Sequence, residues 1–236
     1  PTINLDYNQR GLGSATAIGG YSYLRNKNGD ILINPSNGLP VVNTNFLPIG
    51  DRNPDFTIGL TNEFRVGEFS LSFLLDIRKG GDVYNGTARF LHQRGLSTTL
   101  PDRNQPYIFN GVLRDGRENT ESPTKNSIQV TPLTRSDFFS AAPESEFVEE
   151  DINWIRLRDV SINYNIPSSI LKGSKLFKSA KIFVSGTDLW LLTNYSGADP
   201  NVNGNSATTR GVGAFGFDFG TISLPRTISG GIRITL

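Results

Sequence analysis

The sequence predicts an all-β fold in which antiparallel up-and-down strands form the C-terminal part of a large transmembrane β-barrel. Three observations support this prediction. Long segments alternate apolar and polar side chains with a period of two, one of the two alternating rows carries no charge, and short connections alternate with long ones. Transmembrane barrels combine these three properties.

The first two predicted strands form one long antiparallel hairpin. Over 55–66 the even positions are apolar except for Asn62, and over 69–78 the odd positions are all apolar. Gly67 and Glu68 separate the two segments, and a Gly-X pair suits a two-residue hairpin turn. Because successive side chains of a strand point to opposite faces, we expect one apolar and one polar face.

Two further strands are predicted later in the chain. Over 159–166 the even positions are apolar, and over 227–236 the even positions are apolar apart from Gly230. The segments 152–158 and 181–191 also favour strands, but their alternation is blurred. A further strand is expected before Arg25.

Charged residues avoid one row of these strands. The apolar rows of the four clear strands hold 20 positions without Asp, Glu, Lys or Arg, whereas the opposite 20 positions hold seven. Chance alone, at 19% charged residues, predicts about four of 20. Both the core of a soluble β-sandwich and membrane hydrocarbon exclude charge, which costs about 2–4 kcal/mol at mid-membrane. The charge pattern therefore leaves both environments open.

The lengths of the connections favour the membrane. Two residues join the first and second strands, whereas 79–151 joins the second and third and 192–225 precedes the last. The long connections therefore fall on one edge, as in outer-membrane barrels. We expect 1–54 to hold a strand and an extracellular loop, and 55–236 to hold barrel strands with extracellular loops at 79–151 and 192–225.

Five or six strands cannot close into a barrel with a useful interior. An open sheet in lipid would leave unpaired edge amides, each costing several kcal/mol. We therefore expect the remaining strands to come from more of the same polypeptide or from further chains, and the first alternative is simpler.

The composition excludes several functional classes. The chain has no Cys and one His, His92, which excludes disulfide scaffolds, Cys-ligated metals and multi-histidine sites. Its net charge of +1 provides no basic field that would attract nucleic acid. It contains no apolar run of about 18 residues, the length of a spanning helix, and residues 1–10 have neither a basic region nor an apolar core, so we expect no helical anchor and no signal peptide in this sequence. We predict that the chain is not an enzyme and uses no metal or other cofactor.

Short sequence segments carry a resemblance to a known family. In chain order they are IGDRNPDF (49–56), GLTN (59–62), LSFLLD (71–76), KGGDVYN (79–85), IRLRDV (155–160), YNIP (164–167), FVSGTDL (183–189), TNYSGADP (193–200) and LPRT (224–227). This ordered series, over about 28–236, resembles the C-terminal portion of SusC/RagA-type TonB-dependent outer-membrane transporters.

The resemblance implies a 22-stranded barrel with an N-terminal plug, in the outer membrane of a Gram-negative bacterium. It implies import of oligosaccharides or peptides, with a SusD-like surface lipoprotein as lid and energy supplied through TonB. The plug and the TonB-contacting segment have no counterpart here. The expected partners are therefore the remaining barrel and plug of the same transporter, the SusD-like lipoprotein, TonB through the absent N-terminal part, and the lipid bilayer.

The last predicted strand ends in a candidate assembly signal. Ile232, Ile234 and Leu236 form an apolar row that barrel-insertion machinery would recognise, although the family usually ends in an aromatic residue. The alternative is that these side chains only face lipid.

An aromatic, glycine-rich stretch at 211–220 contains the candidate ligand contacts. Phe215, Phe217 and Phe219 would stack on sugar rings, with Asp218 bonding hydroxyl groups. The alternative, packing against the barrel rim or a partner, suits aromatic residues at membrane interfaces. The acidic run Glu144, Glu146, Glu149, Glu150 and Asp151 lacks calcium-loop spacing and favours a solvated loop, and His92 favours a surface position on a short loop helix.

Two other functional classes remain as alternatives. A soluble or surface-attached β-sandwich for glycan binding or adhesion would use the same aromatic loop as its contact surface. An isolated hydrolase domain is the weakest alternative.

Overall fold

The computed structural model describes residues 14, 16–135, 137–171, 177–202 and 215–235. The chain divides into two compact units. The strand unit comprises Pro54–Gly81, Asp151–Pro200 and Ile222–Leu236, and the connection unit comprises Pro1–Asn53, Asp82–Glu150 and Asn201–Thr221. Each unit is described below by itself.

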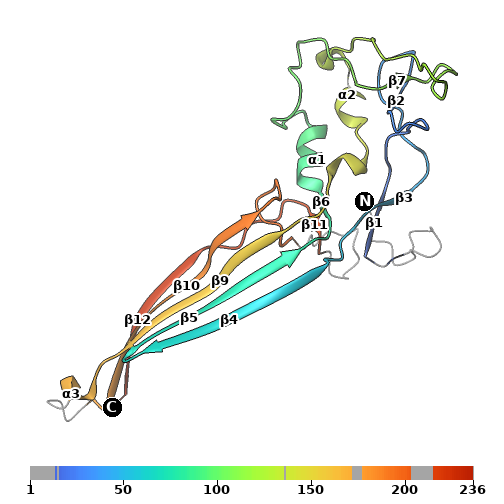
Figure 1. Cartoon of the computed structure of the whole chain (residues 1–236). Helices are drawn as coiled ribbons and strands as arrows, with labels where there is room; N and C mark the ends of the chain where they lie inside the picture. The colour runs from blue at the N-terminus through green and yellow to red at the C-terminus, as the bar shows by residue number, and fades with distance from the viewer. Residues whose placement is uncertain (1–13, 15, 136, 172–176, 203–214, 236) are drawn as a thin grey trace. The chain divides into compact units, whose positions relative to one another are not determined.

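The strand unit contains one five-stranded antiparallel sheet with the order β12-β10-β9-β5-β4 (Figure 1). Each strand pairs with the next long strand along the chain, so the predicted up-and-down arrangement is confirmed. The strands are β4 (Phe56–Val66), β5 (Phe69–Lys79), β9 (Trp154–Asn165), β10 (Ser179–Thr193) and β12 (Thr227–Thr235), and the short helix α3 (Ser168–Leu171) lies between β9 and β10.

The sheet is open. In the part of the chain that the structure describes, β4 and β12 pair on one side only and no strand joins them into a closed barrel. A barrel segment was predicted and an antiparallel sheet is found, but a complete barrel would require strands from elsewhere.

The β4–β5 hairpin has the predicted two-residue turn. Val66 pairs with Phe69, and Gly67 between them has a φ of 57°, a conformation that glycine adopts without a steric penalty. The turn sets the register of the whole hairpin, from Val66–Phe69 to Phe56–Lys79.

Two bulges explain why the alternation blurs in β9 and β10. Leu74 of β5 pairs with Asp159, but Leu75 pairs with Leu157, which leaves Arg158 as an extra residue. On the other side of β9, Asp188 and Leu189 of β10 together oppose Arg158. An extra residue in a bulge breaks the period of two, so a strict alternation search loses the phase there.

The connection unit contains short elements that pair across long sequence distances. The helices are α1 (Gly86–Gln93), η1 (Pro132–Thr134), α2 (Asp137–Ser140) and η2 (Glu144–Phe147). Of the described helices in the whole chain, none is both long enough and apolar enough to cross a membrane. The strands form the pair β1 (Ala17–Gly20) with β3 (Leu47–Asp51), the sheet β11 (Phe217–Asp218), β6 (Val83–Asn85) and β8 (Val148–Glu149), and the pair β2 (Leu32–Ile33) with β7 (Val112–Leu113).

This unit also has its own packed core. One cluster of buried side chains brings together Ile18, Tyr84, Ala142, Phe147 and Phe217. A second cluster contains Leu39, Val130 and Phe138. The segments that the sequence predicted only as a first strand and long loops are therefore packed against one another.

Candidate functional site

The register of the five long strands divides their side chains between two faces. Residues directly opposite each other in an antiparallel pair share a face, so one row of each strand can be followed across the whole sheet. We call one of these two faces the apolar face. Phe56 and Lys79, which pair with each other, form a row at its end, and its other members, none of them charged, are Ile58, Leu60, Asn62, Phe64, Val66, Phe69, Leu71, Phe73, Leu75, Ile77, Ile155, Leu157, Val160, Ile162, Tyr164, Ala180, Ile182, Val184, Gly186, Trp190, Leu192, Ile228, Gly230, Ile232 and Ile234.

The apolar face is exposed even at the centre of the sheet. Ile162 lies on the middle strand β9 and is 52% exposed, and Val184 on β10 is 50% exposed. In a soluble sandwich a middle strand would be covered by a second sheet. A contiguous exposed apolar surface that extends over five strands marks an interaction surface.

Aromatic side chains gather toward both ends of the apolar face. Near the Gly67 turn, Phe64 stacks on Phe73 with 6.1 Å between ring centroids, and Phe69 lies 4.5 Å from Tyr164. Trp190 lies in the half of the sheet nearer the long connections and is 47% exposed. Girdles of aromatic residues at both water interfaces are typical of membrane barrels.

The strands are also long enough to cross a membrane. The 12 residues of β9, at about 3.3 Å each, span about 40 Å, and a tilt of about 40° reduces this to about 30 Å. Membrane hydrocarbon is about 30 Å thick. The length of β9 therefore fits one crossing.

The opposite face, which we call the polar face, carries the charges of the described strands apart from Lys79. Asp76 of β5 accepts from Nη2 and Nε of Arg158 at 2.5 and 3.2 Å. Serine, threonine and asparagine fill most of the remaining positions, such as Ser72, Ser161 and Ser185, which lie side by side on three strands. This face suits contact with water or a polar solute.

The two most buried charges of the strand unit, Arg156 and Asp199, form one cluster with the partly buried Asp188. The Arg156 side chain is 2% exposed and donates to both carboxylates, to Asp188 at 3.2 Å. Asp188 projects from the β10 bulge with a φ of 50°, a rare backbone conformation for a residue other than glycine. Asp199 belongs to the segment after β10, so the cluster fixes that segment to the polar face.

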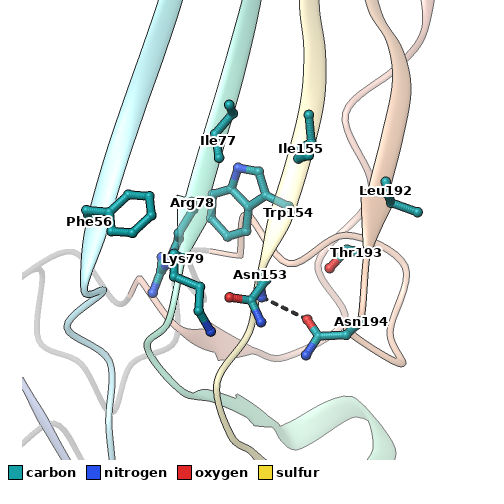
Figure 2. A pocket seen from close by; sticks show the side chains of 10 residues that line it. All are labelled: Phe56, Ile77, Arg78, Lys79, Asn153, Trp154, Ile155, Leu192, Thr193 and Asn194. Atoms are coloured by element: carbon teal, nitrogen blue, oxygen red, sulfur yellow. Dashed lines mark hydrogen bonds between the residues drawn. The ribbon is translucent and has the colours of Figure 1, made fainter.

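A second arginine, Arg78, lies at the end of the polar face, where it pairs with Trp154 at the start of β9. Its guanidinium lies 4.9 Å from the ring of Trp154, and its Nε donates to the carbonyl of Gly80 at 3.0 Å. Both residues are buried, each with less than a tenth of its surface exposed. Figure 2 shows these two residues among those at this end of the strands.

Sequence reasoning did not single out Arg156, Asp188 or Asp199 as a site. The segments IRLRDV, FVSGTDL and TNYSGADP carried these residues as part of the resemblance, but Arg156 and Asp199 lie 43 positions apart. No local spacing rule links residues at that distance.

The structure brings the four candidate ligand contacts together in the connection unit. Phe217 and Asp218 are buried, at 1% and 4% exposure, and Asp218 accepts from Thr87 Oγ1 at 2.7 Å. Phe215 and Phe219 are both 41% exposed, and the Arg52 guanidinium lies 4.5 Å from the Phe215 ring centroid. Ligand contact stays a prediction for these residues.

The candidate assembly row lies at the end of β12. Ile232 and Ile234 are 65% and 51% exposed and belong to the apolar face. Leu236 lies outside the described residues. Recognition by assembly machinery stays a prediction.

The acidic residues between Glu144 and Asp151 make contacts with different partners and do not converge on one point. Glu144 pairs with Arg89 at 2.8 Å, and Glu149 accepts from the Asn85 side chain at 2.8 Å. Across the described ranges, no group of three or more potential ligands could hold a metal ion. His92 lies on α1, half-buried with its ring 5.3 Å from that of Phe147, and burial lowers its pKa.

Comparison with known proteins gives relatives that are much longer than this chain. No family model matches it. It is 29% identical to TonB-dependent receptor P3 of Formosa agariphila over 188 residues. The aligned region covers 79% of this chain and 17% of the receptor. The chain is 27% identical over 228 residues to TonB-dependent receptor P26 of the same organism, which covers 95% of this chain and 20% of the receptor.

Among solved structures, the fold resembles that of the RagAB peptide importer. The TM-score is 0.53 for its closed-closed state, with 13% sequence identity over 92% of this chain and 23% of the other. The TM-score is also 0.53 for the open-open state, with 14% identity. This chain therefore spans about a fifth of the proteins it matches.

Proposed function

From the homology of this chain to TonB-dependent receptors, we propose that it is a wall segment of an outer-membrane importer. The homology implies a location in the outer membrane of a Gram-negative bacterium. In this proposal the apolar face contacts lipid, the polar face lines the lumen, and the action is binding and passage without bond-making.

The single observation that carries the proposal is the exposure of an apolar face across five strands, with Lys79 at its end as the one charge on the described strands of this face. Hydrocarbon satisfies such a face without any further protein layer. The strand length and the aromatic residues toward both ends support the same environment. Within the described residues of the strand unit, no second sheet offers the core that a soluble sandwich needs.

The proposed substrate and partners rest on the sequence resemblance and on one of the similar solved structures. RagAB is a peptide importer, and we propose oligosaccharides or peptides as the cargo here. We also propose a SusD-like surface lipoprotein as lid, and coupling to TonB through the part of the polypeptide outside this chain. The long connections after β5 and β10 would then form the extracellular side, where the lid binds.

Contact with lipid can be tested with cysteines at adjacent residues of β9. Ile162→Cys lies on the apolar face and Ser161→Cys on the polar face. The chain has no native cysteine, so each label is unique within it. The full-length receptor, labelled with bimane and reconstituted into vesicles, is compared in ordinary and brominated phosphatidylcholine, because bromine quenches only a fluorophore that touches acyl chains.

We expect strong quenching at position 162 and little at position 161. Equal quenching at both positions, or none at either, would reject the assignment of the two faces. Absence of quenching together with solubility without detergent would favour the β-sandwich instead.

Import itself is tested in cells that carry the full-length receptor. Uptake of labelled peptide and labelled oligosaccharide is measured with and without a protonophore, which removes the energy that TonB supplies. We expect energy-dependent uptake of one of the two classes. An uptake rate that is the same with and without the protonophore would reject the importer proposal.

A further inference from the structure

A hollow lies at the end of the apolar face nearest the long connections. Its volume is about 400 Å³, and Figure 2 shows the side chains that line it. Its apolar part is formed by Phe56, Ile77, Ile155 and Leu192, and Asn153 and Asn194 lie at its lip. Lys79 and, from the rows of the polar face, Arg78, Trp154 and Thr193 complete the lining.

The hollow spans the boundary between apolar and polar residues on the sheet. Ile77, Ile155 and Leu192 are paired in one row, the last uncharged row of the apolar face in this direction. One step further along the strands come Lys79, Asn153 and Asn194. In a membrane, this change of chemistry marks the level where acyl chains meet headgroups.

The lip is preformed, and its Lys79 charge is paired with Asp151. Asp151, with a φ of 51°, uses its carbonyl to accept from the side chains of Asn153 and Asn194 at 2.6 and 3.0 Å. The backbone N–H of Asn153 donates to Asn194 Oδ1 at 2.8 Å, the bond drawn in Figure 2. Lys79 Nζ lies 2.8 Å from both carboxylate oxygens of Asp151, which offsets its charge.

The chemistry of the hollow restricts what can occupy it. A polypeptide segment would bring backbone N–H and C=O groups that need hydrogen bonds, but β5 and β9 are already paired on both sides. A strand added at the unpaired edge of β4 would extend the sheet in its own plane and would not enter the hollow. A polar solute would find no bonding groups on Ile77, Ile155 and Leu192. An acyl chain has no polar group to satisfy.

We propose that this hollow binds the acyl chain of a membrane lipid, with the headgroup at the Asn153–Asn194 lip. The site rests on the proposed function, because it requires the apolar face to lie in lipid. It goes beyond that function in separating a retained lipid, held in a shaped hollow, from the exchanging lipids that touch the remainder of the face.

The test places the photo-reactive residue p-benzoylphenylalanine in the full-length receptor at Leu192, inside the hollow. Val184 on the same strand and face, outside the hollow, is the matched position, and Thr61 on the polar face is the negative control. Each protein is irradiated either in the native membrane or after exhaustive exchange into detergent. Mass spectrometry then identifies the adducts.

In the membrane we expect lipid adducts at 192 and 184 and none at 61. After detergent exchange we expect lipid adducts at 192 to exceed those at 184 about tenfold. Ile77→Trp, which fills the hollow, should abolish the retained adduct, whereas Leu71→Trp on the same face should preserve it.

The outcomes separate this inference from the proposed function. Adducts at 192 and 184 that are both lost on exchange would overturn the lipid site and leave the lipid-facing wall standing. Absence of lipid adducts at both positions in the membrane would overturn both. An adduct to polypeptide at 192 would show that protein fills the hollow, and would overturn the site.

Discussion

Arg156 is the residue whose surroundings differ most from what its position in the sequence suggests. It lies in the segment 152–158, for which the sequence predicts only a strand with blurred alternation, yet its side chain is 2% exposed and contacts two carboxylates. Taking three charges out of water is costly, and their attraction offsets that cost only while all partners are present. The cluster therefore contributes a defined geometry for the segment that carries Asp199 more than it contributes net stability.

Replacing Arg156 tests this interpretation. Arg156→Met removes the guanidinium that both carboxylates contact, and we expect it to destabilise the folded receptor by about 3–5 kcal/mol. The heat-induced shift from folded to unfolded form on seminative gels measures the change. Arg158→Met is the control, because the Arg158–Asp76 pair is only partly buried and should cost about 1 kcal/mol or less. Equal losses in the two variants would contradict the role of burial.

His92 gives a second prediction at the level of one residue. Burial lowers its pKa below the ordinary 6.5, so the unfolded chain takes up the proton more readily than the folded chain. Stability is therefore complete above the ordinary pKa and falls as the pH drops through it. We expect α1 to exchange its amide hydrogens faster at about pH 5.5 than at about pH 7.5 after correction for intrinsic rates.

The non-titrating variant His92→Gln should lose this acid sensitivity. Burial raises the pKa of the nearby Glu146, which acts in the opposite direction. Because Glu146 is common to both proteins, the difference between wild type and variant isolates His92. The same acid response in both would show that another group is responsible.

Among the elements, β9 tests the environment of the apolar face most directly because it is the middle strand. Ile162→Lys puts a charge on that face, and we expect a cost of about 2–4 kcal/mol if the position lies near the membrane midplane. Ser161→Lys puts the same charge on the polar face and should cost far less. The measurement is the fraction of receptor that reaches the folded form in the outer membrane. A larger loss for Ser161→Lys would reverse the assignment of the faces.

The strands β4, β5 and β12 were predictable because each keeps the period of two over its whole length. The hairpin of β4 and β5 follows from its alternation and from Gly67, and the structure differs from the expected bounds by only a residue or so. In β9 and β10 the period breaks at Arg158 and Asp188. A bulge depends on pairing with neighbouring strands, so no single segment reveals it.

The connection unit was not predictable in the same way. Its strands are as short as two residues, such as Phe217–Asp218, and have no measurable period. Phe217 pairs with Tyr84, and their ring centroids lie 5.9 Å apart although more than a hundred positions separate them in the chain. Tertiary contacts of this kind, and the Arg156 cluster likewise, form only when distant segments meet.

At the scale of the whole chain, the two units differ in how they bury apolar side chains. The connection unit packs residues such as Ile18 and Tyr84 into a core with almost no exposure. The strand unit leaves residues such as Val66 and Ile228 more than three-quarters exposed. With a net charge of +1, the chain has no strong electrostatic field that would draw it to a charged partner. The exposed apolar face therefore determines which environment the strand unit occupies.

The behaviour of residues 1–236 expressed alone follows from that face and from the two sheet edges. β4 and β12 each present a row of backbone N–H and C=O groups that no described strand pairs. In water, such edges and an exposed apolar face promote association, and in lipid each unpaired group costs several kcal/mol. We therefore expect the isolated chain to aggregate without detergent, and to fold only with the remaining strands of the receptor. Size-exclusion chromatography with light scattering measures this, with the detergent-solubilised full-length receptor as the folded control. A monodisperse monomer that unfolds cooperatively in plain buffer would show that protein covers the apolar face, and the lipid-facing wall would have to be abandoned.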